Sequence, residues 1–160
     1  MQRRALLAAA ASAGLAGCGF QLRQPPQMPF KSIALIGFAP KSPLAAELRT
    51  TLALQIKVLE SPAGADVVLQ ATEEGRERSV VASTSAGQVR EMQLRVKLNF
   101  RAQTPGGRQL IAPAELLLSH DMIYNETAAL GKQQEEDELF RDMQSDVVRQ
   151  VLRRLAAVKL

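Results

Sequence analysis

Residues 92–101 read MQLRVKLNFR, and apolar and polar side chains alternate through the whole stretch. Successive side chains of a β-strand point to opposite faces of the sheet, so this alternation is typical of a strand with one dry face and one wet face. The polar members are Gln93, Arg95, Lys97, Asn99 and Arg101. We therefore expect a long strand here, with a row of cations on its outward side.

Turn-forming residues bound this strand, at residues 85–87 before it and 104–107 after it. Beyond the second turn, residues 110–122 are expected to return as a neighbouring strand, and Pro113 marks an edge strand or a bulge because proline lacks an N–H. Upstream, short apolar runs at 33–36, 56–59 and 67–69 predict further strands. The third of these is expected to resume as Val80-Val81 after the charged segment 73–78.

Two helices are expected to cover this sheet. Ser42 and Pro43 form an N-cap followed by a first-turn proline, and Leu44, Leu48 and Leu52 then recur every four residues. Near the C-terminus, the acidic residues 135–138 are placed in the opening turns of a second helix, where they would complement its dipole. Its apolar stripe is formed by Leu139, Met143, Val147, Val151, Leu155 and Val158. The predicted fold class is α+β, with two helices packed on one face of a roughly four-stranded mixed or antiparallel sheet.

The N-terminus has the order of an export signal. Arg3 and Arg4 precede an apolar stretch, and small residues lead to Cys18 in the sequence LAGC. This predicts a signal peptide over residues 1–17 and acylation of Cys18; the alternative is cleavage elsewhere, which leaves a free thiol. The Arg pair leaves both the general and the twin-arginine export routes open.

The residues after Cys18 suggest where the chain goes. Gly19 stands where an Asp would commonly retain a lipoprotein in the inner membrane, so we expect a lipid anchor in the outer membrane. Residues 18–30 contain three prolines within six positions and are expected to form an extended tether. Residues 31–160 are expected to form a single domain.

Composition argues against several classes of function. The chain has 20 Lys+Arg against 16 Asp+Glu. Removal of Arg3 and Arg4 leaves 18 against 16, and a net charge of +2 is too small to predict binding of nucleic acid. His120 is the only histidine and Cys18 the only cysteine. A neighbouring Ser119 would point to the opposite face of a strand from His120, and a metal site would lack further ligands. We expect no catalytic residue, no metal and no cofactor.

Four stretches, taken together, resemble the LptE family of lipopolysaccharide-assembly lipoproteins. The first three are CGFQLR at 18–23, SPL at 42–44 before the leucine-spaced helix, and GQ at 87–88 before the long strand. The fourth is LGK at 130–132, which is followed by an acidic-amide run and by a helix that ends in LRRL at 152–155. Their order and spacing cover most of the sequence after the signal peptide.

The resemblance implies a two-helix, four-strand sandwich that sits as a plug inside the LptD barrel and has no enzymatic activity. It also implies support for barrel assembly and binding of lipopolysaccharide through basic residues at one end of the fold. Lys132 matches one of these; the other position is Ser85 here, and Arg90, or Arg76 with Arg78, could supply the missing charge.

The outward row on the long strand has two interpretations. Arg95, Lys97 and Arg101 are candidates for contact with a polar barrel lumen, although plain exposure to solvent would explain them equally well. Two other functions also remain open at this stage. One is a generic outer-membrane adaptor of another assembly complex, and the other is a lipid-anchored hydrolase, which a lone histidine disfavours.

Overall fold

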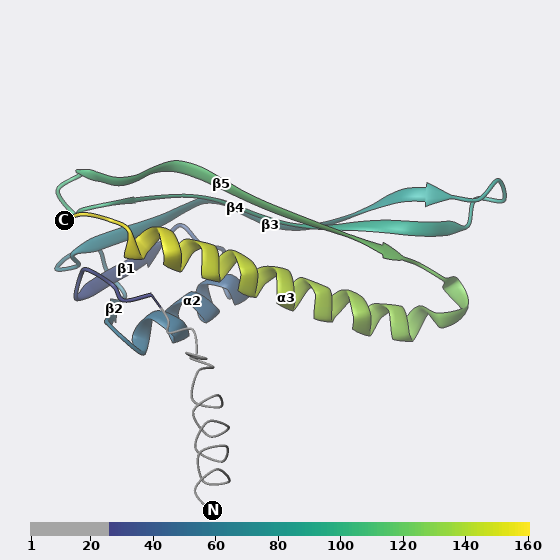
Figure 1. Ribbon diagram of the computed structural model, residues 1–160, viewed down its shortest axis with the longest axis horizontal. Coiled ribbons are helices and arrows are strands. Elements are labelled where there is room, and N and C mark those ends of the chain that lie inside the picture. Colours follow the sequence, from purple (N-terminus) through teal and green to yellow (C-terminus); the bar gives the residue numbers. More distant parts are fainter. Residues whose placement is uncertain (1–25) are drawn as a thin grey trace, which may run out of the picture.

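The strands form one mixed sheet in the order β2-β1-β3-β4-β5, and both α-helices lie on the same face of it (Figure 1). The computed structural model describes residues 26–160. Its strands are β1 (Ser32–Ile36), β2 (Lys57–Leu59), β3 (Val67–Ser83), β4 (Val89–Gln103) and β5 (Gln109–Ile123), and its helices are α2 (Pro43–Ala53), the short 3-10 helix η1 (Glu126–Ala128) and α3 (Ala129–Ala156). The predicted signal peptide, Cys18 and most of the tether lie outside the described residues.

The predicted fold class is confirmed, with five strands instead of about four. The apolar run at 56–59 forms β2, whose three residues pair in parallel with β1 from Ser32↔Lys57 to Ala34↔Leu59. β1 also pairs in parallel with β3, whereas β3, β4 and β5 are antiparallel neighbours. A strand of three residues at the edge of the sheet adds few hydrogen bonds.

The core lies between the sheet and the two helices. Leu44, Leu48 and Leu52 of α2 are buried, as their spacing predicts, and Ser42 caps this helix by accepting a hydrogen bond of 2.9 Å from the backbone N–H of Ala45. The apolar members of the 92–101 alternation are buried too, because β4 is the second strand from the β5 edge and faces α3. Its largest side chain, Phe100, is 1% exposed.

The strand β3 is continuous through the charged segment 73–78, where we expected an interruption. Backbone pairing with β4 runs on from Glu73↔Asn99 to Val80↔Met92, so polar side chains do not break the strand. The register shifts between Ala71 and Glu73, which makes Thr72 an extra, bulged residue. A second shift lies near Val81.

The helix α3 begins at Ala129, six residues before the acidic run that we placed in its opening turns. Its first turn contains no acidic residue, so residues 135–138 lie in later turns, where the helix dipole has little effect. η1 leads directly into α3, and the Asn125 side chain supports this entry by accepting a 3.1 Å hydrogen bond from the N–H of Thr127. Glu136, which we expected in an ordinary helix start, is buried.

Pro113 and Gly37 each lie at a backbone position that suits their residue type. Pro113 lies on the edge strand β5 next to an irregularity in the register, between the pairs Phe100↔Ala114 and Ala102↔Ile111. Gly37 ends β1 with φ +78°, and a Cβ atom there would lie 2.1 Å from the carbonyl oxygen of Ala71. A side chain at this position is therefore excluded both by conformation and by space.

The molecule has two distinct ends (Figure 1). The near end is the end at which β1 and β2 begin, α3 ends, and a turn joins β4 to β5. The far end holds the β3–β4 turn, the end of β5, η1 and the start of α3. α2, β1 and β2 are confined to the near half, whereas α3 runs beneath the sheet along most of the molecule.

Candidate functional site

The outer face of the sheet, opposite the helices, carries the polar side chains of β4. These alternate with the buried members of the strand, as the sequence predicts. Both helices lie on the other face (Figure 1), so no helix of residues 26–160 covers this one. The structure therefore places the three predicted barrel-contact residues, Arg95, Lys97 and Arg101, in one row.

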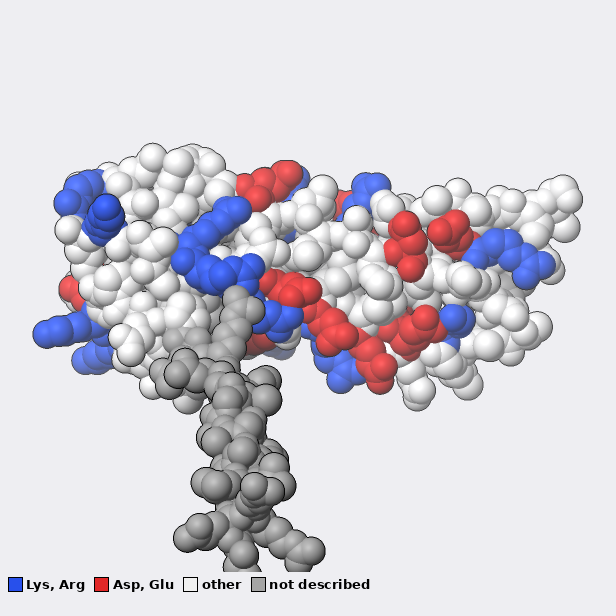
Figure 2. Space-filling model, in the orientation of Figure 1, with Lys and Arg blue, Asp and Glu red and all other residues white. Residues whose placement is uncertain are grey.

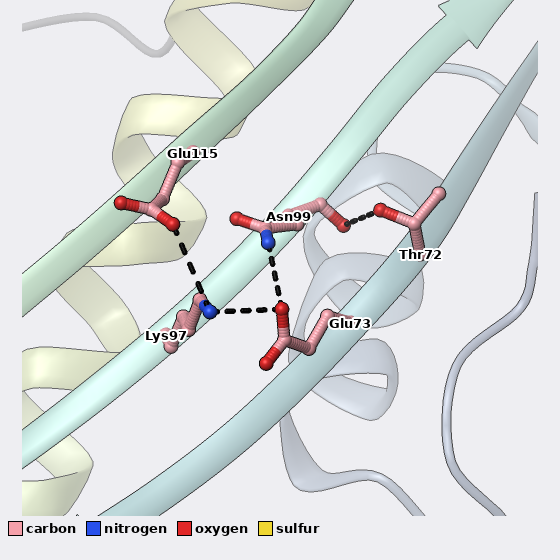
Figure 3. Close-up of polar contacts among 5 residues, drawn as sticks. All are labelled: Thr72, Glu73, Lys97, Asn99 and Glu115. Atoms are coloured by element: carbon pink, nitrogen blue, oxygen red, sulfur yellow. Dashed lines mark hydrogen bonds and ion pairs between the residues drawn. The ribbon is translucent and has the colours of Figure 1, made fainter.

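Lys97 lies at the centre of a polar network on this face (Figure 3). Its Nζ atom lies 2.8 Å from Glu73 Oε2 on β3 and 3.8 Å from Glu115 Oε2 on β5, so one cation links three strands. The pKa of Lys97 is raised above its usual value of 10.5, chiefly by the hydrogen bond to Glu73. Asn99 Nδ2 donates a second bond of 2.8 Å to the same Glu73 oxygen.

The two arginines of the row make hydrogen bonds to neutral groups of the same sheet. Arg95 Nε donates to Gln93 Oε1 at 2.7 Å, and Arg101 donates through Nε and an Nη atom to Gln70 Oε1 at 3.0 and 2.8 Å. Among residues 26–160, neither arginine has a carboxylate within ion-pair distance. Their positive charges thus remain available at the surface, whereas that of Lys97 is shared between two carboxylates.

A shallow depression of about 270 Å³ interrupts this outer face. It is lined by Thr72, Asn99, Phe100, Pro113, Ala114 and Glu115. Within the described part of the chain, the buried Oδ1 atom of Asn99 accepts no hydrogen bond.

The two basic residues predicted to bind lipopolysaccharide lie at the far end. Lys132 is in the first turn of α3, where its Nζ atom lies 2.6 Å from Glu135 Oε2. Arg90 is the second residue of β4, and its carbonyl oxygen accepts a bond of 2.9 Å from the N–H of Tyr124. Arg90 also lines a hollow of about 250 Å³ with Asn125, just before η1, and Thr127, within η1. Ser85 lies in the β3–β4 turn at the same end.

Large apolar side chains are exposed at this end as well. Their exposed fractions are 53% for Val80, 53% for Val81, 75% for Ile123 and 86% for Leu130. This exposure was not predicted, since an apolar pair such as Val80-Val81 in a strand normally indicates burial. One feature of the sequence could have predicted the exposure: between the helix that follows Ser42 and residue 129, no segment has a helical pattern that could cover the far parts of the strands.

Arg76 and Arg78, the other candidates for the missing charge, lie on the helix side of β3. Arg76 donates to Gln144 Oε1 and lies over the ring of Phe140, 5.5 Å from its centroid. Arg78 Nη1 lies 3.4 Å from Glu136 Oε2. Both guanidinium groups therefore hold α3 against the sheet, which leaves Arg90 as the candidate whose charge is not used in this way.

Residues 26–160 contain no group of three His, Cys, Asp or Glu side chains placed to hold a metal ion. His120 is exposed on the edge strand β5. No helix in this part of the chain combines the length and the apolar character that a bilayer-spanning segment needs.

Comparison with known proteins agrees with this geometry. A family model described as "LptE: Lipopolysaccharide-assembly" matches residues 30–155. The chain belongs to the LptE family. The match includes the sheet, both α-helices and the far end with Lys132 and Arg90.

Two curated LptE-family proteins are similar over most of their length. The LPS-assembly lipoprotein LptE of Photorhabdus laumondii is 28% identical over 146 residues, which cover 89% of this chain and 79% of that protein. The protein of the same name from Pectobacterium atrosepticum is 27% identical over 147 residues, with the same coverage.

Solved structures show the same fold. The solution structure of an uncharacterized lipoprotein B from Nitrosomonas europaea has a TM-score of 0.74 and 26% identity, and covers 87% of this chain and 91% of that one. The rare lipoprotein B of Shewanella oneidensis, at 22% identity, reaches a TM-score of 0.66 over 79% of this chain and 95% of that one. The latter likeness concerns the fold alone.

Proposed function

We propose that this chain is a non-enzymatic lipoprotein that fills and helps to assemble an LptD barrel of the outer membrane and binds lipopolysaccharide during its insertion into the outer leaflet. Membership of the LptE family and the names of its Photorhabdus and Pectobacterium relatives support a role in lipopolysaccharide assembly. Lipopolysaccharide binding is proposed from the far end, the contact with the barrel from the outer face of the sheet, and the lipid anchor from Cys18.

The observation that carries lipopolysaccharide binding is the composition of the far end. Lipopolysaccharide presents phosphates and carboxylates beside acyl chains, so a protein that binds it needs cations and apolar groups together. Lys132 and Arg90 supply cations there, and Ile123 and Leu130 supply exposed apolar surface. The Lys132–Glu135 pair is partly exposed, and an exposed pair of this kind is weak enough to be exchanged for a phosphate.

The outer face of the sheet supports the plug. A barrel lumen is polar, and a protein that fills it should present hydrogen-bonding side chains without apolar area. Arg95 and Arg101 keep unneutralised charge on this face. Barrel side chains of complementary type would satisfy these groups.

The anchor is proposed at Cys18, with two or three acyl chains. Each CH₂ group buried in the bilayer contributes about 0.8 kcal/mol, so several chains hold the protein stably where one would not. The short distance in sequence between Cys18 and the first described residue, Pro26, keeps the fold close to the membrane.

Charge reversal at Lys132 tests the binding site. We expect Lys132→Glu to weaken lipopolysaccharide binding about tenfold, because a charge-assisted bond is replaced by repulsion. Affinity would be measured with the full mature chain at low salt, where electrostatic effects are largest. Arg49→Glu, the same change at an exposed position of α2, is the control. An affinity that Lys132→Glu leaves unchanged would remove Lys132 from the site.

Partner identity tests the plug. An affinity pull-down from detergent-solubilised outer membranes, followed by mass spectrometry, should recover one large barrel protein at equal stoichiometry. Recovery of the chain alone, or with a mixture of periplasmic proteins, would contradict the plug and favour an adaptor.

A further inference from the structure

Positive charge gathers at the near end of the molecule. Figure 2 shows Lys and Arg side chains over this end, and most of the visible Asp and Glu farther along the molecule. The residues concerned come from four separate elements or turns: Lys31 before β1, Lys57 at the start of β2, Arg108 in the β4–β5 turn, and Arg153 and Lys159 at the end of α3 and beyond it. The strand pairing brings them together, since Ser32 pairs with Lys57 and β3 begins beside the end of β4.

These cations are not neutralised by the fold itself. None of the five takes part in an ion pair with another residue of the range 26–160. Two acidic residues lie in the segments that adjoin β2 and β3: Glu60, after β2, and Asp66, before β3. Asp66 Oδ2 already accepts bonds of 2.9 Å from the backbone N–H groups of Lys31 and Ser32. The near end therefore presents an excess of positive charge to whatever it faces.

An open groove of about 580 Å³ lies within this basic region. Its lining combines the cations Lys31 and Lys57 with apolar side chains that include Met28, Leu54 and Ile56, and it contains no acidic residue. Leu54, just after α2, is 82% exposed. A large apolar side chain between two lysines is the composition that suits a lipid interface, where apolar groups enter the acyl boundary and ammonium groups meet phosphates.

The path of the chain places this groove beside the proposed anchor. Gln27 and Met28 line it, and Pro26, the first described residue, follows Cys18 by eight positions. Eight residues span at most about 28 Å when fully extended. Acyl chains on Cys18 would thus hold the near end, and not the far end, next to the surface of the bilayer.

We infer that the near end rests on the membrane and binds anionic phospholipid headgroups, with Lys31 and Lys57 on the phosphates and Leu54 in the interface. This inference goes beyond the lipopolysaccharide site, which lies at the opposite end of the molecule, and it rests on the lipid anchor in the proposed function. The basic surface gives the anchored protein a second membrane contact and a fixed orientation.

A fluorophore at Leu54 tests the contact. The mature lipoprotein with Leu54→Cys, whose only other cysteine is the acylated Cys18, would be labelled with an environment-sensitive dye and reconstituted into vesicles. The vesicles contain phosphatidylcholine alone, or phosphatidylcholine and phosphatidylglycerol in equal amounts, with a spin-labelled lipid as quencher. Leu117→Cys, at an exposed position of the outer face, carries the control label.

We expect the Leu54 dye to be quenched by lipid, more strongly in the anionic vesicles, and the Leu117 dye to stay unquenched in both. Lys31→Glu with Lys57→Glu should lower the quenching at Leu54 to the level of the neutral vesicles while the protein still floats with them. Flotation without quenching at Leu54 would overturn the inference and leave the anchor intact. A shielded but unquenched dye would mean that residues 18–25 cover the groove, which also overturns it. Loss of flotation would refute the anchor and the inference together.

Discussion

The near and far halves of the sheet are packed in different ways. In the near half, α2 and the end of α3 both pack on the sheet, and the side chains between them, such as Leu48, Leu69 and Phe100, are at most 1% exposed. In the far half, α3 alone faces β3, β4 and β5 (Figure 1). There the contacts between layers include charged groups, and four large apolar side chains remain exposed.

The core residues of the two halves also differ in type. Leucine, isoleucine and valine dominate the near half, whereas Met92 and Met122 pair directly in the far half. Methionine fills irregular space without fixing a single conformation. From this comparison we expect the near half to contribute more to the stability of the fold than the far half.

The largest effect should come from removing a large side chain in the near half. Phe100→Ala is expected to lower the free energy of unfolding by about 3–5 kcal/mol, because it deletes buried surface and leaves a cavity. Denaturant unfolding would measure this, with Leu54→Ala as a control that should change stability by less than about 0.5 kcal/mol. A loss below about 1 kcal/mol for Phe100→Ala would contradict the assignment of stability to the near half.

A smaller loss is expected at Gly37, also in the near half. Gly37→Ala would place a Cβ atom against the Ala71 carbonyl at a positive φ, so we expect a cost of about 3 kcal/mol. Gly107→Ala is the matched change: its φ is +88°, but nothing lies within 4 Å of the added Cβ, and about 1 kcal/mol should be lost. If the two variants were equally stable to heat, the short contact with Ala71 would not be the reason why position 37 requires glycine.

In the far half, the ion pair between β3 and α3 should contribute little. A double-mutant cycle with Arg78→Met and Glu136→Gln is expected to give a coupling of about 0.5 kcal/mol, since the Arg78 side chain is 59% exposed. Hydrogen exchange should rise in the far parts of β3 and α3 and stay unchanged around β1. A rise that extends through β1 would mean that the two halves unfold as one unit.

The smallest effect is expected on the outer face, which belongs to neither core. The pKa of Lys97 is raised in the folded protein, so its charged form is stabilised by folding. The resulting stability is complete below the usual lysine pKa of 10.5 and is lost as pH rises through the raised value. The difference in unfolding free energy between the protein and Lys97→Met should therefore be constant at neutral pH and shrink in alkali. A difference that grows with pH would exclude the Glu73 contact as its cause.

Much of the near half could be predicted from local sequence patterns. The alternation in residues 92–101, the cap at Ser42 and the leucine spacing of α2 each depend on neighbours within a few positions. Pro113 likewise marked the edge of the sheet correctly. Such features follow from backbone geometry alone, which is why a single sequence reveals them.

The far half was predicted less well, because its structure depends on contacts between distant segments. Where the two halves meet, Gln144 of α3 is buried and is hydrogen-bonded to Pro43 and Glu47 of α2 and to Arg76 of β3; no local pattern predicts a buried glutamine. Glu136 in the same way looked like part of an acidic, solvated run. The position of Lys132 at the far end was anticipated through family resemblance, whereas the exposed apolar residues beside it were not.

The bulge at Thr72 decides which charges β3 turns toward α3. Before it, odd-numbered residues such as Ala71 face the helices; after it, even-numbered ones do, which directs Arg76 and Arg78 to the buried side and Glu73 to the outer face. Had Thr72 taken a regular place in the ladder, the alternation would turn Glu73 and Glu77 toward a helix that already presents Glu136. Deleting Thr72 would remove the bulge and still leave Glu73 opposite Asn99 on the outer face. The electrostatics of half the molecule therefore depend on how the backbone of this one residue is paired, and much less on its side chain.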